Sequence, residues 1–136
     1  MTAPLDRVGP LRVSTPAESV RAFRRETGWR DADGPPPASY PVVFMRMPEI
    51  GEPIRRAAQE IGLPVHEAQH FEYARPVEID AEYDVTMELR RESDPPRLVS
   101  IAEVCDLSGA FVARVTTTLR LIDPATVARL APKAPS

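Results

Sequence analysis

The sequence of 136 residues contains no asparagine, one cysteine and one lysine, Lys133. The absence of asparagine excludes every site chemistry that depends on this side chain. The single cysteine, Cys105, cannot form a disulfide within the chain. A reducing compartment fits this cysteine usage, and we expect a cytoplasmic protein.

Long hydrophobic runs are also missing. No stretch approaches the roughly 20 apolar residues that a membrane-spanning helix needs, and the first residues lack the continuous apolar region of a signal peptide. The net charge is -3 at pH 7, and no cluster of basic residues provides the positive face that phosphate binding requires. We therefore expect neither a membrane nor a nucleic-acid partner.

The residues that are present have the composition of a globular protein, with 43% hydrophobic and 27% charged. The length suits one continuous core and is short for two domains. We expect a single domain over residues 1–136, with a flexible arm over residues 1–10 and a disordered tail over residues 131–136.

The first expected element is a helix from Pro16 to about Thr27. Thr15 is placed to act as its N-cap, and a proline fits the first helical position because no N–H is needed there. Val20 and Phe23 form the apolar face of this helix, whereas its arginines, Arg24 among them, are expected to face water.

A loop rich in proline and aspartate follows, over residues 29–41. Residues 41–61 then combine an apolar start with helical spacing, and Pro48 interrupts them. We interpret this stretch as one kinked, largely buried helical segment.

The second half of the chain has the pattern of antiparallel strands. Between Glu82 and Leu89, apolar and polar residues alternate as in a half-buried strand. Two further strands are expected at Leu98–Cys105 and Ala110–Ile122, because turn residues separate them. Asp123, followed by a proline, predicts a short terminal helix. Together these elements indicate an α+β fold.

His66 and His70 frame the letters H-E-x-x-H, the signature of zinc proteases. On a helix both imidazoles reach one Zn²⁺, but on a strand they lie about 13 Å apart at roughly 3.3 Å per residue. We predict a strand and no metal site, because Pro64 lies just before the motif, a third histidine is missing, and Phe71 continues an alternating pattern. With Phe71 inward, both histidines fall on the convex face, unless a bulge at Pro64 and Val65 reverses His66.

The order of helix, proline-rich loop, buried helix and four strands is that of a hot-dog fold, in which a curved antiparallel sheet wraps a central helix. Three motifs carry a family resemblance: Ala22-Phe23 with Glu26-Thr27-Gly28, Pro37-Ala38-Ser39-Tyr40-Pro41-Val42-Val43, and His66 through Pro76 with the spacing to Glu82. Through them the chain resembles the MaoC-like dehydratases, the (R)-specific enoyl-thioester hydratase group, and in particular their non-catalytic N-terminal halves or accessory subunits. The resemblance covers roughly Val13 to Leu121.

In the catalytic members of that family an Asp and a His, in a segment of the form Asp-x-Asn-Pro-x-His after the first helix, act on a water and the substrate. The matching segment here, Gly28–Pro35, has neither histidine nor asparagine. The resemblance therefore implies that the usual catalytic pair is absent, and it implies no cofactor. Asp31, Asp33 and His66 remain as candidates for an unorthodox catalytic site.

The resemblance also implies a tunnel for the acyl chain of a thioester. The substrate-binding candidates are Trp29, Tyr40, Phe44 and Met45, each of which fits a place in the core equally well. The implied partners are an acyl-CoA or acyl-carrier-protein thioester and a second hot-dog domain, in a homodimer or a heterodimer.

The leading hypothesis is an accessory, tunnel-forming component of a 3-hydroxyacyl-thioester dehydratase, which is an enoyl-thioester hydratase in the reverse direction. One alternative is a self-sufficient homodimeric hot-dog enzyme, a dehydratase or a thioesterase, with an unorthodox site. Another is a non-catalytic module that binds acyl thioesters. The last is a small zinc hydrolase that uses the H-E-x-x-H motif.

Overall fold

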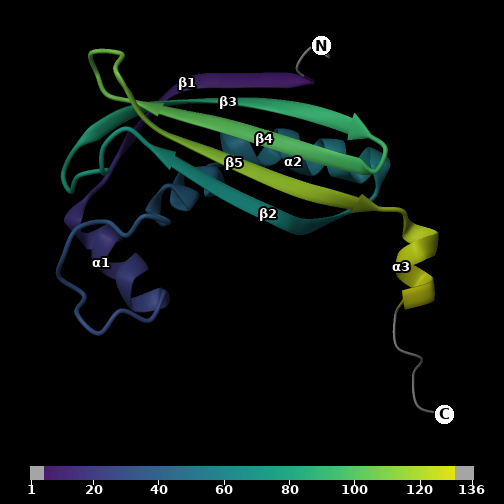
Figure 1. The fold of residues 1–136 in the computed structure, drawn as a ribbon, viewed down its shortest axis with the longest axis horizontal. Helices are drawn as coiled ribbons and strands as arrows, with labels where there is room; N and C mark the ends of the chain where they lie inside the picture. Colours follow the sequence, from purple (N-terminus) through teal and green to yellow (C-terminus); the bar gives the residue numbers. More distant parts are fainter. Residues whose placement is uncertain (1–4, 131–136) are drawn as a thin grey trace.

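A computed structural model describes residues 5–130. Five strands form one antiparallel sheet in the order β1-β3-β4-β5-β2 (Figure 1). The elements along the chain are β1 (Asp6–Ser14), α1 (Ala17–Glu26), the 3₁₀ helix η1 (Tyr40–Arg46), α2 (Pro48–Ile61), β2 (Leu63–Tyr73), β3 (Glu82–Ser93), β4 (Pro96–Cys105), β5 (Phe111–Ile122) and α3 (Pro124–Leu130).

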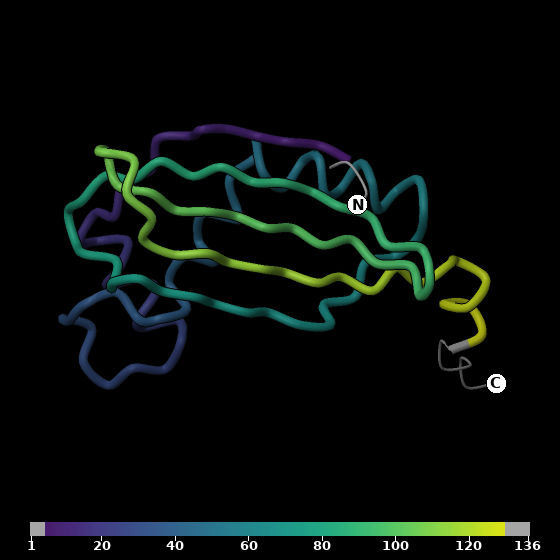
Figure 2. Tube along the Cα trace, turned by 45° about the horizontal axis from the view of Figure 1, so that its top comes forward, coloured from purple at the N-terminus to yellow at the C-terminus, as the bar shows by residue number. Residues whose placement is uncertain are grey.

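The helix α2 lies against one face of the sheet, which we call the concave face (Figure 1). Turning the molecule by 45° shows the same arrangement, with α2 beneath β1 and β3 and with β2 at the opposite edge (Figure 2). Ile50, Ala57 and Ala58 of α2 are buried in the core. This is the expected arrangement of a central helix wrapped by an antiparallel sheet.

The alternation predicted for β3 is present in the structure. Its buried residues are Tyr83, Val85, Met87 and Leu89. Because residues directly opposite one another in a sheet share a face, the register carries this buried set across to β4 and β5. The prediction of a strand at the H-E-x-x-H motif is also confirmed, since β2 contains both histidines.

The segment predicted as one kinked helix consists of two helices, and the break between them falls at Pro48, where the sequence predicts an interruption. The 3₁₀ helix η1 ends at Arg46, and Met47 has extended backbone angles of φ -63° and ψ 137° before α2 begins at Pro48. A proline disfavours the helical conformation of the residue before it, which explains the break. None of the helices in residues 5–130 is long and apolar enough to cross a membrane.

The prediction of a flexible arm over residues 1–10 is wrong for residues 6–10, which belong to β1. This strand pairs with β3 from Asp6 opposite Leu89 to Ser14 opposite Glu82, with a register shift after Val8. Gly9 and the proline after it interrupt the alternation that marks a strand in sequence, while the pairing with β3 continues past them. Residues 1–4, and the tail predicted over residues 131–136, lie outside the described residues.

Thr15 does not cap α1, contrary to the prediction. Its buried hydroxyl donates to the carbonyl of Glu78 at 2.6 Å and accepts from the backbone N–H of Ala81 at 3.0 Å. The carboxylate of Asp80 instead accepts a hydrogen bond from the N–H of Ala17 at the start of α1. The helix is thus capped by a residue more than sixty positions away, a long-range contact that local sequence patterns do not reveal.

Candidate functional site

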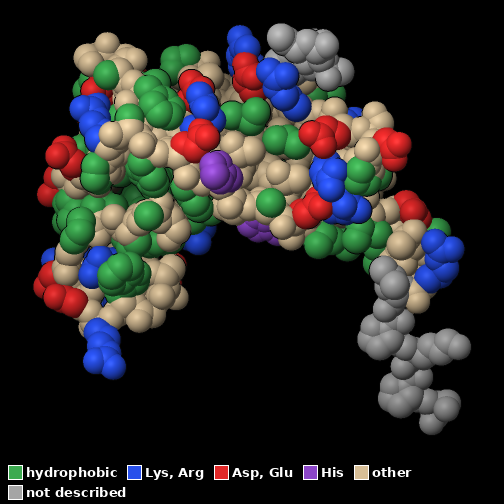
Figure 3. Space-filling view, viewed as in Figure 1, with side chains coloured by type: hydrophobic (Ala, Val, Ile, Leu, Met, Phe, Trp, Pro, Cys, Tyr) green, Lys and Arg blue, Asp and Glu red, His purple; other side chains and the backbone are tan. Residues whose placement is uncertain are grey.

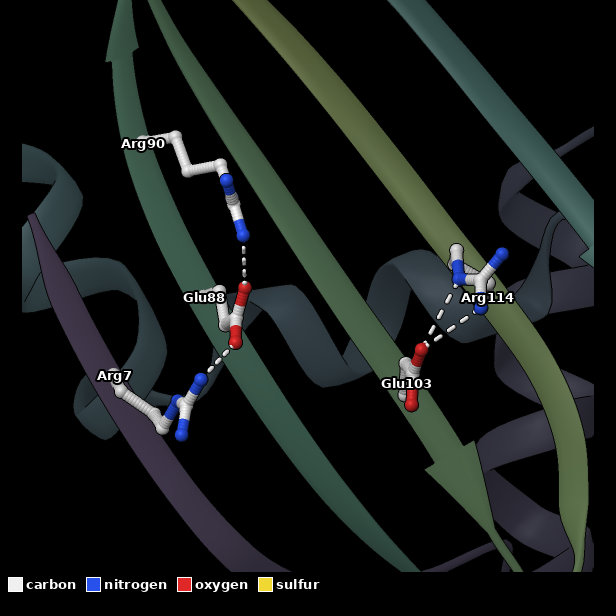
Figure 4. Close-up of polar contacts among 5 residues, drawn as sticks. All are labelled: Arg7, Glu88, Arg90, Glu103 and Arg114. Atoms are coloured by element: carbon white, nitrogen blue, oxygen red, sulfur yellow. Dashed lines mark hydrogen bonds and ion pairs between the residues drawn. The ribbon is translucent and has the colours of Figure 1, made fainter. Parts of the chain in front are cut away.

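The convex face of the sheet carries ion pairs between neighbouring strands. Glu88 on β3 accepts from Arg7 on β1 and from Arg90, and Glu103 on β4 accepts from Arg114 on β5 at 2.9 Å (Figure 4). Acidic and basic side chains stand side by side over this face in Figure 3. Exposed pairs of this kind contribute little to stability. Because these charges bind one another, the concave face is the more suitable surface for a ligand.

A bulge in β2 decides which of its residues reach the concave face. The register of β2 against β5 shifts between His66 and Ala68, so that Glu67 is the extra residue. The carboxylate of Glu67 accepts hydrogen bonds from Arg97 at 2.8 Å and from Arg120 at 2.9 Å on the convex face. These two guanidinium groups lower the pKa of Glu67 to about 2 and hold the bulge in place.

The bulge separates the two histidines. His66 lies opposite Leu119, which packs against the core, and therefore points to the concave face. His70 lies opposite Thr116 on the convex face, 3.6 Å from Glu72. The expectation from strand parity is thus correct for His70 and wrong for His66, because the bulge at Glu67 reverses the face.

The opposite orientation of His66 and His70 decides whether the H-E-x-x-H motif can bind zinc. Two histidines on opposite faces of a strand cannot bind the same ion, so the reading of H-E-x-x-H as a helical zinc site is wrong. Among residues 5–130 no group of three or more His, Cys, Asp or Glu side chains is arranged to hold a metal ion.

A row of polar side chains crosses the concave face of three adjacent strands. Ser100 on β4 is opposite Thr117 on β5, and Thr117 is opposite Gln69 on β2. The amide of Gln69 donates to the hydroxyl of Thr117 at 2.8 Å. Neighbouring rows on this face are largely apolar, with Val115 and Phe71 on one side. We call Ser100, Thr117 and Gln69 the polar row.

Ser100 is the buried end of the polar row. It is 1% exposed, and its Oγ has no hydrogen-bond partner among residues 5–130. An unsatisfied buried hydroxyl costs about 1–3 kcal/mol. The polar row thus reaches the buried part of the sheet at an energetic cost.

The concave face opens toward β2. Ser100 on β4 is buried, whereas Thr117 on β5 and Gln69 on β2 are half-buried. Nearer the start of β2, His66, which lies opposite Leu119 on the concave face, is exposed. The concave face is therefore more accessible along the edge strand β2 than at β4.

A pocket of about 380 Å³ lies at the far end of β2, between this strand and the loop after α1. Its lining is Pro36, Pro37, Ala38, Tyr73, Ala74, Arg75, Pro76 and Val77. The hydroxyl of Tyr73 donates to the carbonyl of Ala38 and so ties the loop to the strand. Burial raises the pKa of Tyr73 to about 12. We call this cavity the proline pocket.

The loop that forms one wall of the proline pocket is folded around Arg24. This residue is 6% exposed, so the expectation that it faces water is wrong. Its guanidinium donates to the carbonyls of Asp31 at 2.9 Å and Pro35 at 3.0 Å, and it lies 4.3 Å from the ring centre of Trp29. A Cβ at Gly34 would come within 2.8 Å of its Cζ atom, so any other residue at this position would displace the guanidinium.

The carboxylates predicted as catalytic candidates in this loop point elsewhere. Asp33 accepts from Arg21 at 3.0 Å, with a side chain 77% exposed. Asp31 accepts from the backbone N–H of Asp33 at 2.9 Å and is exposed. Neither residue lines the proline pocket, and neither lies on the concave face with His66.

The four substrate-binding candidates occupy different environments. Tyr40 is 1% exposed and stacks edge-on between Phe23 and Phe44, at centroid distances of 5.3 and 6.0 Å. Met45 is half-buried and packs against the core, whereas Trp29 lies over Arg24 and is 49% exposed. The structure does not bring the four together, and their role in binding stays a prediction.

Sequence reasoning missed Arg24, Ser100 and Thr117. For Arg24 a signal existed, because it follows the buried Val20 by four positions and thus shares its helix face. For Ser100 and Thr117 none existed, since their alignment with Gln69 follows only from the register of three strands.

No family model matches this sequence, and no curated protein matches it. Solved structures do match. The C-terminally truncated HadBC (3R-hydroxyacyl-ACP dehydratase) complex of Mycobacterium tuberculosis gives a TM-score of 0.65 at 17% identity, covering 82% of this chain and 91% of that chain. HtdX of Mycobacterium tuberculosis gives a TM-score of 0.64 at 16% identity, and the match covers 88% of this chain and 52% of the HtdX chain.

A third match is the fluoroacetyl-CoA thioesterase FlK, with a TM-score of 0.59 at 17% identity over 97% of this chain and 98% of that chain. At these identities the matches establish a shared architecture. The chain has the hot-dog fold, as its sequence predicts.

Proposed function

We propose that this chain is an acyl-thioester-binding component of a 3-hydroxyacyl-thioester dehydratase. In this proposal the chain forms one wall of the substrate channel, and a homologous hot-dog partner supplies the Asp and His that carry out the dehydration. The fold shared with the HadBC dehydratase complex supports this assignment, as do the sequence motifs of the MaoC-like family.

The accessory role is supported by the loop after α1, which lacks a catalytic pair. The segment Gly28–Pro35 contains no histidine, and its two carboxylates are exposed and engaged within the loop or with Arg21. The guanidinium of Arg24 fills the interior of the loop. General acid–base catalysis requires an acid and a base within hydrogen-bond reach of one water, and this loop offers no such pair.

A partner domain is part of the proposal because the site is half open. The edge strand β2 has 11 residues, and its outer backbone groups pair with no strand among residues 5–130. Edge strands of this length favour pairing with another chain. A second hot-dog domain along β2 would close the channel over Gln69.

The test is a dehydratase assay with 3-hydroxyacyl-CoA and 3-hydroxyacyl-carrier-protein substrates. The chain is assayed alone and together with a hot-dog protein that retains the Asp-x-Asn-Pro-x-His segment. We expect turnover only in the mixture. Full activity of the isolated chain would contradict the accessory role.

A self-sufficient homodimer is the second candidate, and the position of His66 favours it. The bulge at Glu67 turns this imidazole to the concave face, three residues from Gln69. The fold shared with the thioesterase FlK makes hydrolysis a reaction to include in the assay. If this candidate holds, the isolated chain turns over a thioester and the His66→Ala variant does not.

Binding of an acyl thioester without turnover, alone and in every mixture, would instead identify a non-catalytic module. Neither enzymatic candidate requires a cofactor, because dehydration and hydrolysis need only acid–base groups and water. A cytoplasmic location stays a prediction.

A further inference from the structure

The polar row offers hydrogen-bond groups that the fold does not use. Gln69 donates one amide N–H to Thr117. Within residues 5–130, its second N–H, its carbonyl oxygen and the hydroxyl proton of Thr117 make no side-chain hydrogen bond. The second N–H of Gln69 and the hydroxyl of Thr117 are therefore two donors at one point of an accessible apolar face. Two such donors suit a ligand with one carbonyl oxygen.

The proline pocket has the opposite character. Pro36, Pro37 and Pro76 have no backbone N–H to donate. The hydroxyl of Tyr73 is engaged by Ala38, and the guanidinium of the rim residue Arg75 by Asp106. A cavity of about 380 Å³ with its polar side chains already paired suits a hydrocarbon chain.

The two features lie on one strand and on one face. Gln69 is opposite Thr117 and Tyr73 is opposite the buried Ala113, so both point to the concave face, with Phe71 between them. Four residues of strand span about 13 Å at roughly 3.3 Å per residue. An extended chain of about ten carbons has this length.

We propose that an acyl thioester lies along the concave face of β2, with its carbonyl oxygen at Gln69 and Thr117 and the end of its alkyl chain in the proline pocket. The distance between the two features then selects acyl chains of about ten carbons. This inference rests on the proposed function and adds the chain length and the two contacts that set it.

The test is calorimetric titration of the full chain, alone and with its catalytic partner, with saturated acyl-CoA thioesters of about four to about sixteen carbons. Affinity should rise to about ten carbons and then level off or fall. The Ala38→Leu variant, which narrows the pocket, should weaken binding of the longer chains by about tenfold and leave the shortest unchanged.

The Gln69→Leu variant should weaken binding of all chain lengths by roughly tenfold, because it removes the carbonyl contact and not the pocket. Alkyl-CoA thioethers, which lack the carbonyl, should bind wild type and Gln69→Leu equally. Thr117→Val removes the hydroxyl donor of the same carbonyl contact. His70→Ala, on the convex face of the same strand, is the control and should change nothing.

A flat dependence on chain length, or equal losses for thioester and thioether in Gln69→Leu, would overturn this inference while leaving the proposed function intact. Failure of the wild-type complex to bind or dehydrate any thioester would overturn the proposed function and this inference with it. Thermal unfolding of each variant separates a lost contact from a lost fold.

Discussion

His66 lies directly opposite Leu119 across β2 and β5, and so it shares the concave face with the core. His70, four residues later, lies opposite Thr116 on the other face. The reason is the single extra residue between them, Glu67, which changes the parity of the strand. One bulge therefore decides which histidine is available to a ligand of the concave face.

The first prediction concerns zinc. Because His66 and His70 point to opposite faces, neither can assist the other in binding an ion. After dialysis against zinc and removal of the excess, we expect no stoichiometric zinc by elemental analysis. One zinc per chain, lost in both His66→Ala and His70→Ala, would contradict this placement of the two side chains.

The second prediction concerns acid stability. Arg97 and Arg120 lower the pKa of Glu67 to about 2, from an ordinary value of 4.5. A carboxyl group whose pKa is lower in the folded than in the unfolded state stabilises the fold above its unfolded pKa. That contribution is lost as the pH falls through the folded value. The free energy of unfolding should therefore decline between about pH 4.5 and pH 2.

The Glu67→Gln variant provides the measurement. Urea unfolding followed across this pH range should show a smaller decline in the variant than in the wild type. Glu49→Gln, which removes an exposed carboxylate of α2, is the control and should keep the wild-type slope. An unchanged slope in Glu67→Gln would show that the bulge is not held by its two arginines.

Much of the fold was predictable because its signals are local. The alternation from Tyr83 to Leu89 marks β3 whatever the strand pairs with, and Asp123 caps α3 through the N–H of Thr126 at 2.9 Å, three residues on. The bulge at Glu67 has no such local signal. It is set by the two arginines on other strands, so sequence reasoning could allow a bulge near this point without fixing its position or its cause.

The candidate site was less predictable than the fold for the same reason. Gln69, Thr117 and Ser100 are far apart in sequence and meet only through strand register. Asp80 likewise caps α1 from a distant turn. Arg24 is the exception, because its position four residues after Val20 indicates burial although its charge favours water.

The third prediction concerns Arg24. Its guanidinium makes two hydrogen bonds to loop carbonyls and lies over Trp29. Hydrogen bonds from a charged group contribute about 1.5–3 kcal/mol each, so Arg24→Ala should lower the free energy of unfolding by about 3 kcal/mol. Arg24→Lys should recover little, because an ammonium group lacks the planar fork.

Chemical denaturation measures this loss, and Arg25→Ala serves as the control. Arg25 is the exposed neighbour of Arg24 on the same helix, and its removal should change stability by less than about 0.5 kcal/mol. Equal effects of the two alanine variants would show that the loop does not depend on the buried guanidinium.

The fourth prediction concerns the buried end of the polar row. Because the Oγ of Ser100 has no partner among the described residues, Ser100→Ala, which removes this hydroxyl, should raise the free energy of unfolding by about 1 kcal/mol. Ser108→Ala makes the same chemical change where the hydroxyl donates to Asp106 at 2.6 Å. That variant should be destabilised, and a loss of stability in Ser100→Ala would contradict the structure.

The last prediction concerns Tyr73, which joins β2 to the proline-rich loop through Ala38. Tyr73→Phe removes this hydrogen bond and should lower the free energy of unfolding by about 1 kcal/mol at neutral pH. Burial raises the pKa of the phenol to about 12 in the folded chain, from an ordinary value of 10.0. The unfolded chain therefore loses this proton at lower pH than the folded chain, and the wild type should lose stability as the pH rises from about 10 to about 12.

The alkaline loss should be smaller in Tyr73→Phe, because the variant has no phenol at this position. Urea unfolding at several pH values measures the loss, and absorbance titration of wild type against variant isolates the ionisation of Tyr73 from that of the other two of the chain's three tyrosines. If the variant loses stability above pH 10 as steeply as the wild type, the phenol is not buried against the loop. The proline pocket would then lack the link between strand and loop that closes it.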